Sequence, residues 1–517
     1  MSRIFTSKKN YSFSFWLILT LLMVIIESTQ SQIIQPDRVE IELNDYDDYY
    51  TVISAKEEGL VLVREDDERG EPRTKNWEVL KFNTDLTQAW KRNLMINLNY
   101  DFTGYEYRNG KVYLLFKSVS YQNDNMILRV MDLETGDTEE AEINYVFPLN
   151  LTEFTVSGNA AILGGYVNYM PAVIHYDLTS KKVKVLPGIY NNRSELVDVS
   201  VDEGTGIFNI LVTEKTFDKR NTLAIKTFDQ NGTLLQNRTL ETKGTNNIIF
   251  GRSTRFNARE QFIAGTYSNN KSSYSSGIFI AKLDAVGGQD ITYISYGDLK
   301  NFFSYMKAKR EARVRDRINR RKIQGKRVKF RYRLLVHDIV EKDNMFLLFG
   351  EAFYPKYNNT ALSSLAYGPY FPRGRYGDNM YFAGYKYTHA VVVAFNKKGK
   401  VLWDNSFEIN DVTSFSLDQY VNASIEEKRV ILLYLYENVI RSKLINEDEI
   451  LEGKTFNDIK MKFEDDVAKN NDNEVGGLSL WYDRFFYAYG VQRIKNIKDR
   501  EAKLSRKVFY INKITYQ

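Results

Sequence analysis

The sequence predicts an all-β fold, a β-propeller of four-stranded blades, on three observations. Strand-like runs alternate with tight polar turns from residue 38 to the end of the 517-residue chain. Each repeating unit holds four such runs, and most units follow one another at about 50 residues. Periods of roughly 40–50 residues with four strands each are typical of propeller blades. Eight blades are favoured and seven remain possible, with second strands expected to begin near residues 58, 111, 160, 206, 260, 344, 428 and 484.

Composition limits the chemistry that this chain can perform. Hydrophobic residues make up 43% and charged residues 26%, which excludes a disordered or fibrous chain. The chain has no cysteine, so disulfides, thiolate metal sites and cysteine nucleophiles are excluded. With only three histidines and a net charge of +5, no metal, cofactor or nucleic-acid partner is expected.

The N-terminus has the pattern of an export signal, expected over residues 1–31. Arg3, Lys8 and Lys9 precede an apolar run from Phe15 to Ile26, and small residues follow. The run holds about 12 residues, fewer than the roughly 20 that span a membrane, although an uncleaved anchor is the alternative. Residues 32–517 are then a single exported propeller domain without a transmembrane span. An exported chain without cysteine suits the envelope of a Gram-negative bacterium, in the periplasm or associated with the outer membrane.

The second unit shows the repeat in detail. Asn109-Gly110 lies between β-rich runs, where Asn-Gly is the strongest short hairpin signal. The third strands of successive units end in Asp or Asn, whose short side chains can bond the backbone two residues on and form a turn. The four strands of the second unit are expected at Phe102–Arg108, Lys111–Ser118, Met126–Asp132 and Thr138–Tyr145. The turn residues along the chain are Asn83, Asp132, Asp177, Asp229, Asp284 and Asn396.

Blade six carries two insertions, and the first, residues 298–327, is predicted to be a basic helix. Asp298 is the expected N-cap, and four apolar residues follow at helical spacing. From Lys307 to Arg333, 14 Lys and Arg face only two acids, a local charge of about +12 that leaves about −7 elsewhere. Gly325 is expected to end the helix, and strand alternation resumes at Val328. The four apolar residues are Leu299, Phe302, Phe303 and Met306.

The second insertion, residues 355–388, is predicted to be a Tyr- and Gly-rich loop between the second and third strands. The link between blades and the second-to-third-strand loop leave a propeller on the same face, so both insertions are expected side by side. Long loops on one face are where function is expected. The alternatives are a solvated basic helix and a loop that only covers apolar surface. The predicted binding residues are Arg313, Arg317, Arg320, Arg321, Tyr370, Phe371 and Tyr381.

The last unit has only three strands, and the mature N-terminus can supply the fourth through Val39–Leu43. Such an exchange closes the ring and removes exposed sheet edges, which otherwise invite aggregation. A string of β-sandwiches is the alternative, but it predicts linkers about every 100 residues, and no Pro/Gly/Ser-rich linker is present. The three strands are expected at Leu478–Tyr482, Phe485–Val491 and Lys507–Ile514.

In period and strand order, residues 38–517 resemble the broad class of exported bacterial β-propeller repeat proteins. The chain has no Gly-His…Trp-Asp repeat, sialidase Asp-box or kelch double glycine, so the resemblance implies a fold and little chemistry. No catalytic residue is predicted. His175, His337 and His389 are interpreted as packed or hydrogen-bonded strand residues, and Glu351 is the one acid singled out.

Together these patterns favour a non-enzymatic, exported binding or scaffold module of the cell envelope. Its loop-rich face would bind a protein or an anionic envelope component, such as lipid head groups or polysaccharide. Clustered tyrosines suit such a role because they offer large contact area at low entropy cost. A propeller enzyme acting on glycans or peptides is the alternative.

Overall fold

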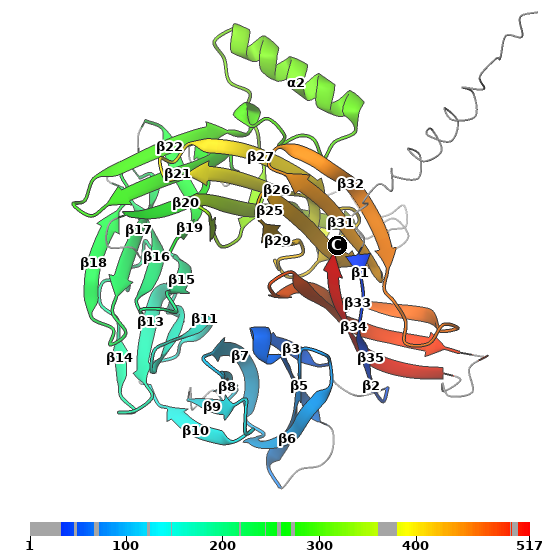
Figure 1. Ribbon diagram of the computed structural model, residues 1–517. Helices are drawn as coiled ribbons and strands as arrows, with labels where there is room; N and C mark the ends of the chain where they lie inside the picture. The colour runs from blue at the N-terminus through cyan, green and yellow to red at the C-terminus, as the bar shows by residue number, and fades with distance from the viewer. Residues whose placement is uncertain are drawn as a thin grey trace, which may run out of the picture.

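The computed structural model describes residues 33–516, except 46–48, 67–71, 121–124, 146, 217–218, 243, 256–259, 270–273, 360–379, 497 and 499–504. The predicted signal peptide, residues 1–31, therefore lies outside the described residues. Within the described chain, the strands form eight antiparallel sheets arranged as a ring of blades (Figure 1). The predicted eight-bladed propeller is confirmed.

Blades one to five share one plan, in which four consecutive strands pair antiparallel in sequence order. Blade one contains β3 (Thr51–Ser54), β4 (Leu60–Asp66), β5 (Thr74–Phe82) and β6 (Gln88–Asn97), with the 3-10 helix η1 (Lys56–Glu58) in its first turn. Blade two contains β7 (Tyr100–Arg108), β8 (Lys111–Ser118), β9 (Met126–Asp132) and β10 (Thr138–Ile143). Blade three contains β11 (Asn150–Ser157), β12 (Ala160–Val167), β13 (Met170–Asp177) and β14 (Val183–Val185). Blade four contains β15 (Leu196–Val201), β16 (Phe208–Lys215), β17 (Asn221–Phe228) and β18 (Leu234–Thr239). Blade five contains β19 (Asn246–Ser253), β20 (Glu260–Asn269), β21 (Gly277–Asp284) and β22 (Gln289–Ser295).

Blades six and eight vary this plan, whereas blade seven keeps it. Blade six contains β23 (Arg333–Val336), β25 (Met345–Asn359), β26 (Met380–Asn396) and β27 (Val401–Glu408), with the short strands β24 (Val340–Lys342) and β28 (Thr413–Ser414) beside them. Blade seven contains β29 (Asn422–Glu426), β30 (Arg429–Tyr436), β31 (Val439–Asn446) and β32 (Glu449–Asp458). Blade eight contains β33 (Val467–Tyr482), β34 (Phe485–Lys495) and β35 (Ser505–Tyr516), joined by β1 (Ile33–Ile34) and β2 (Arg38–Glu42) from the other end of the chain.

Second strands are the most apolar segments because both of their faces lie against neighbouring blades. Such strands appear in a sequence as continuous apolar runs, which is why their positions could be predicted. β8, β12 and β20 begin at the predicted residues, and the other five second strands begin within two residues of prediction.

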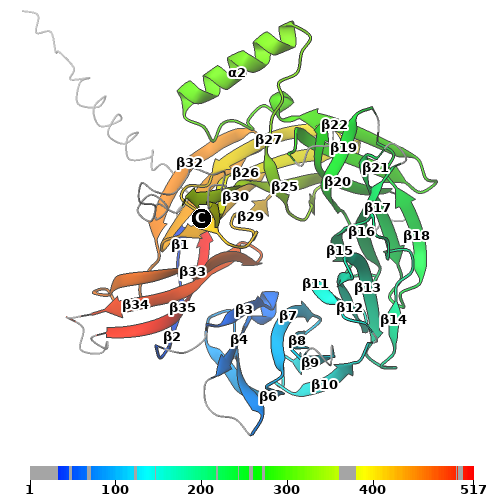
Figure 2. The same cartoon turned by 180° about the vertical axis from the view of Figure 1, so that it is seen from behind.

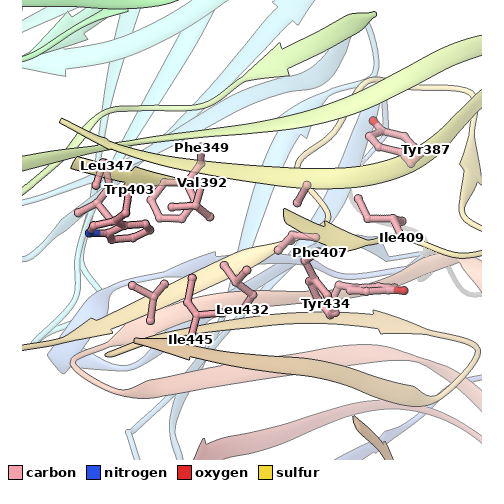
Figure 3. Packing of buried hydrophobic residues seen from close by; sticks show 14 of the residues in the cluster. Leu347, Phe349, Tyr387, Val392, Trp403, Phe407, Ile409, Leu432, Tyr434 and Ile445 are labelled. Carbon is pink, nitrogen blue, oxygen red and sulfur yellow. The ribbon is translucent and has the colours of Figure 1, made fainter. Parts of the chain in front are cut away.

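The core is divided into eight hydrophobic clusters, one at each interface between neighbouring blades. The cluster between blades six and seven packs Leu347 and Val392 against Leu432 and Ile445 (Figure 3). Because each blade buries a face on both sides, the ring is one continuous unit.

Asp and Asn residues at the ends of third strands form turns, as the sequence predicts. The carboxylate of Asp132 accepts the backbone N–H of Glu134 at 2.9 Å. Asp229 accepts the N–H of Asn231 at 3.0 Å in the same way. The interaction depends only on neighbours in sequence, so a single sequence suffices to predict it.

The exchange of the N-terminal strand into the last blade is confirmed. β2 pairs antiparallel with β35 along its whole length, from Arg38 opposite Asn512 to Glu42 opposite Val508. A separate cluster joins blade eight to blade one, and Trp481 Nε1 donates to the carbonyl of Gly59 at 3.1 Å. The ring is therefore closed by both pairing and packing.

Both insertions in blade six depart from prediction in detail. Asp298 is not a helix N-cap: it ends the 3-10 helix η2 (Tyr296–Asp298), and the basic helix α2 (Ala308–Ile323) begins ten residues later. The next strand starts at Arg333 and not at Val328. Both described ends of the predicted loop over 355–388 are strand, because β25 extends to Asn359 and β26 begins at Met380. Residues 360–379 of the predicted loop lie outside the described residues. Mutual pairing of the two strands outweighs the local preferences of proline and glycine.

Candidate functional site

The link from blade five to blade six is anchored in the core before α2 begins. Leu299, Phe302 and Phe303 are buried in the cluster between these blades. The ring of Phe302 stacks on Tyr296, with centroids 4.3 Å apart. These residues lie in turns instead of the predicted helical stripe, because their side chains fill the cluster between the two blades.

The same link is hydrogen-bonded to β27, the outer strand of blade six. The backbone N–H groups of Lys300 and Asn301 each donate to a carboxylate oxygen of Asp404 at 2.7 Å. The N–H of Tyr305 donates to Ser406 Oγ at 3.1 Å. Burial raises the pKa of Asp404, while the two backbone hydrogen bonds favour its ionised form. The link is thereby fixed to the edge of blade six, and α2 lies outside the ring (Figures 1 and 2).

Helix α2 is attached to this link by one face. Val314 and Ile318 pack against the cluster between blades five and six. Arg315 donates to the carbonyl of Leu299 at 2.9 Å, and its guanidinium lies 5.2 Å from the centre of the Phe303 ring. Positions 314, 315 and 318 share one side of a helix because its repeat is 3.6 residues.

The predicted arginines occupy exposed positions on α2. Arg313, Arg317, Arg320 and Arg321, which together we call the arginine surface, are all exposed. Arg320 Nε lies 3.4 Å from the carbonyl oxygen of Asp316. In the part of the chain that the structure describes, none of the four makes an ion pair, whereas Arg315 and Lys322 do. The four guanidinium groups of the arginine surface are therefore not paired with a carboxylate among the described residues.

The aromatic residues of the second insertion can be placed only in part. Tyr381 lies on β26, whereas Tyr370 and Phe371 lie outside the described residues. On the described part of this hairpin, Phe382 contacts Phe415 of the link to blade seven, with ring centroids 6.3 Å apart. That the arginine surface and these aromatic residues form one binding surface stays a prediction.

Glu351, the acid singled out in the sequence, holds a backbone segment in place. It is 1% exposed, and its carboxylate accepts the N–H of Val421 at 2.6 Å and of Tyr420 at 3.1 Å. His337 Nε2 lies 3.6 Å from the same carboxylate. Glu351 therefore holds the link between blades six and seven in place through these hydrogen bonds.

The other two histidines are packed or hydrogen-bonded strand residues, as predicted. His389 is fully buried, and its ring stacks on Tyr305 with centroids 3.7 Å apart. Burial lowers the pKa of His389 to about 3, so the imidazole is neutral. His175 Nε2 lies 2.9 Å from the carbonyl oxygen of Gln230. His337 differs from the prediction because it follows the end of β23.

Sequence reasoning missed two carboxyl groups on the first strands of their blades. Asp198 on β15 forms an ion pair with Arg252 on β19, and burial raises the pKa of Asp198 to about 7. Burial also raises the pKa of Glu106 on β7 to about 7; Glu203 adds to this shift and Arg108 opposes it. No local pattern marks these groups, because their burial depends on residues from other blades.

In the described residues, no group of three or more His, Asp or Glu side chains is arranged to hold a metal ion. No helix in the same part of the chain is both long and apolar enough to cross a membrane.

Comparisons with known proteins add little to the strand topology. No family model and no curated protein matches the chain. Among solved structures, the chain is similar to the polysaccharide lyase Uly1, at 9% identity and a TM-score of 0.41, over 92% of this chain and 100% of that one. It is also similar to the β-propeller domain of the trilobed protease from Pyrococcus furiosus, at 10% identity and a TM-score of 0.35, over 80% and 93%. A third, the Dos1 propeller, matches at 10% identity and a TM-score of 0.38, over 81% and 92%. Likenesses this distant carry no argument about activity, and the class of protein, an eight-bladed β-propeller, is defined by its strands.

Proposed function

We propose that this protein is a non-enzymatic, exported binding module that docks an anionic partner on the arginine surface of α2. The partner would be a protein with an acidic patch or an anionic component of a bacterial cell envelope, such as lipid head groups or polysaccharide. One observation carries the proposal: four exposed arginines, for which the described residues supply no ion pair, are displayed on a helix that is fixed to the ring by Val314, Arg315 and Ile318.

Fixing the helix favours binding, because ordering a mobile segment would cost free energy on association. Guanidinium groups also suit anions, since their forked N–H donors match carboxylate and phosphate oxygens. The rest of the chain is net negative, so the positive field is confined to the region of α2. Val314 and Ile318 pack against the ring, so α2 does not present these apolar side chains to a lipid bilayer. Any contact of α2 with lipid would therefore be electrostatic.

An enzyme acting on glycans or peptides is the second candidate, and Asp198 favours it. A carboxyl with a pKa of about 7 suits general acid–base chemistry at neutral pH. Asp338 lies 3.6 Å from Arg252 Nε and brings a second carboxylate to the same arginine. Asp198→Asn would abolish the turnover of such an enzyme and leave binding at the arginine surface intact.

Binding to three anionic probes at low salt tests the proposed function. The probes are phosphatidylglycerol vesicles, polygalacturonate and polyglutamate, which separate lipid, polysaccharide and acidic protein. We expect the variant R313E/R317E/R320E/R321E to lose about tenfold or more in affinity for the probe that the wild type binds best, since charge complementarity is reversed.

A matched control separates this surface from overall charge. The variant K181E/K182E/K397E/K398E makes the same change in net charge at exposed lysines in turns of blades three and six. It should bind like the wild type, and circular dichroism should show both variants folded. Equal losses in the two variants, or no loss in either, would refute the arginine surface as the docking site.

Export is the second part of the proposal, and N-terminal sequencing of the purified protein tests it. The mature chain should begin near Gln32 and be recovered outside the cytoplasm. A cytoplasmic protein that retains Met1 would contradict this part and leave the docking surface to be judged by the binding experiment.

A further inference from the structure

A cavity of about 810 Å³ lies where blades six, seven and eight meet. Its walls come from the link between blades six and seven (residues 411–420), the turn between β30 and β31, and parts of β33, β34 and β35. The volume is within the range of small-ligand pockets, roughly 300–1,000 Å³. We propose that this cavity binds an organic cation, the alkylammonium or guanidinium group that a lysine or arginine side chain carries.

The charged side chains that line the cavity are all acidic. They are Asp411, Asp418 and Glu437, all exposed, and no Lys, Arg or His is among the described residues that line the cavity. Several carboxylates in a cleft whose walls have a low dielectric constant concentrate a negative potential there. This potential attracts cations and repels anions. The cavity is thus selective by charge.

Two arginines, Arg441 and Arg38, lie against tyrosines that line the cavity. The guanidinium of Arg441 lies 5.1 Å from the centre of the Tyr436 ring, and that of Arg38 lies 4.6 Å from the centre of the Tyr510 ring. Arg38 also forms an ion pair with Glu40 at 2.8 Å. Neither arginine is among the residues that line the cavity.

Aromatic side chains supply the second requirement of a cation site. Phe415 is 69% exposed, and Tyr420 and Tyr489 line the same cavity. The faces of aromatic rings attract ammonium and guanidinium groups within about 6 Å of the ring centre. Burial raises the pKa of Tyr489 to about 12, and Tyr105 and the cavity residue Asp418 add smaller contributions to the shift.

This site is independent of the arginine surface. It lies on other elements, and its ligand has the opposite charge, so each proposal can fail without the other. The two sites together would let one protein bind an anionic and a cationic group at the same time.

Calorimetric titration of the full-length mature protein at low ionic strength tests the cavity, with tetralysine as the probe. Tetraglutamate and cellotetraose are the anionic and neutral comparators. We expect saturable binding of tetralysine alone, and a loss of about tenfold or more in the variant D411N/D418N/E437Q. In D418N the amide oxygen can still accept the hydrogen bond that the Ser416 hydroxyl donates to Asp418, so this side-chain contact can be kept.

Controls make each outcome decisive. The variant E134Q/E241Q/D290N removes the same charge at exposed positions on other blades and should bind tetralysine like the wild type. F415A, at an exposed ring, should weaken binding severalfold and serves if the triple variant does not fold. Equal effects of the two triple variants, absence of tetralysine binding, or competition by cellotetraose or calcium would each overturn the proposal.

Discussion

Glu106 lies among charged neighbours from three blades. Arg108 Nε is 3.0 Å from its carboxylate, and Arg108 also pairs with Glu203 of blade four at 2.5 Å. Lys56 of blade one binds the same Glu203 at 3.2 Å. With a pKa of about 7, Glu106 changes its charge near neutral pH inside this network.

Glu106→Gln should therefore remove part of the pH dependence of stability. The pKa of Glu106 is raised from 4.5 to about 7 by folding, so the folded state holds the proton more strongly. Its ionisation therefore destabilises the fold as pH rises through that window. Between about pH 4.5 and pH 8, the wild type should lose about 2 kcal/mol more unfolding free energy than the variant. Urea unfolding at both pH values measures the difference, and identical losses in the two proteins would contradict it.

Residues differ in how far the sequence could predict their roles. Asp132 and Asp229 bond to atoms two residues away, so their turns follow from local sequence. Glu351 was singled out from its position, but its partners, Tyr420 and Val421, lie about 70 residues away. Such partners are set by the closing of blades, which no local pattern contains.

The N-terminal strand β2 is held to the last blade by buried charges as well as by pairing. Arg506 on β35 bridges Glu40 on β2, at 2.9 Å, and Asp466 before β33, at 2.6 Å. Both carboxylates are almost fully buried. Burial opposes the ionisation of Asp466, but hydrogen bonds from Arg506 and Asn496 outweigh it and lower its pKa.

Arg506→Met should loosen this closure strongly. Glu40 keeps its ion pair with Arg38, but the buried carboxylate of Asp466 loses its cation. Breaking a buried ion pair by removing one partner typically costs about 3–5 kcal/mol. Arg493→Met is the matched control on the neighbouring strand, because Arg493 pairs with Asp45 at the surface. That loss should be about 1 kcal/mol or less. Denaturant unfolding compares the two variants, and equal losses would show that the buried network does not secure β2.

Strands could be located from the sequence because their period and apolar runs repeat eight times. The basic helix could be foreseen from its charge but not from its start. The residues predicted as its first turn, Leu299 to Met306, pack against blades five and six instead. The helix begins only after these residues, at Ala308. Tertiary packing overrides local helix preference at such a point.

The eight blades form a closed ring, and the molecule carries its positive and its negative surface in different places on that ring. Eight clusters join each blade to the next, including the last to the first. The arginine surface lies outside the ring on α2, and the acidic cavity lies between blades six, seven and eight. The sequence predicted the first from a run of basic residues. It could not predict the second, because its three acids come from a link and a turn that meet only in the folded ring.

Under the proposed function, the charge of the arginine surface holds an anionic partner. The most direct test is the affinity of the wild type and of R313E/R317E/R320E/R321E for the best anionic probe, measured as salt rises. The screening length falls from about 30 Å at 0.01 M salt to about 10 Å at 0.1 M. The wild type should lose about tenfold or more in affinity over this range, and the variant should bind weakly with little salt dependence. Wild-type affinity that does not change with salt, or the same steep dependence in both proteins, would contradict the claim.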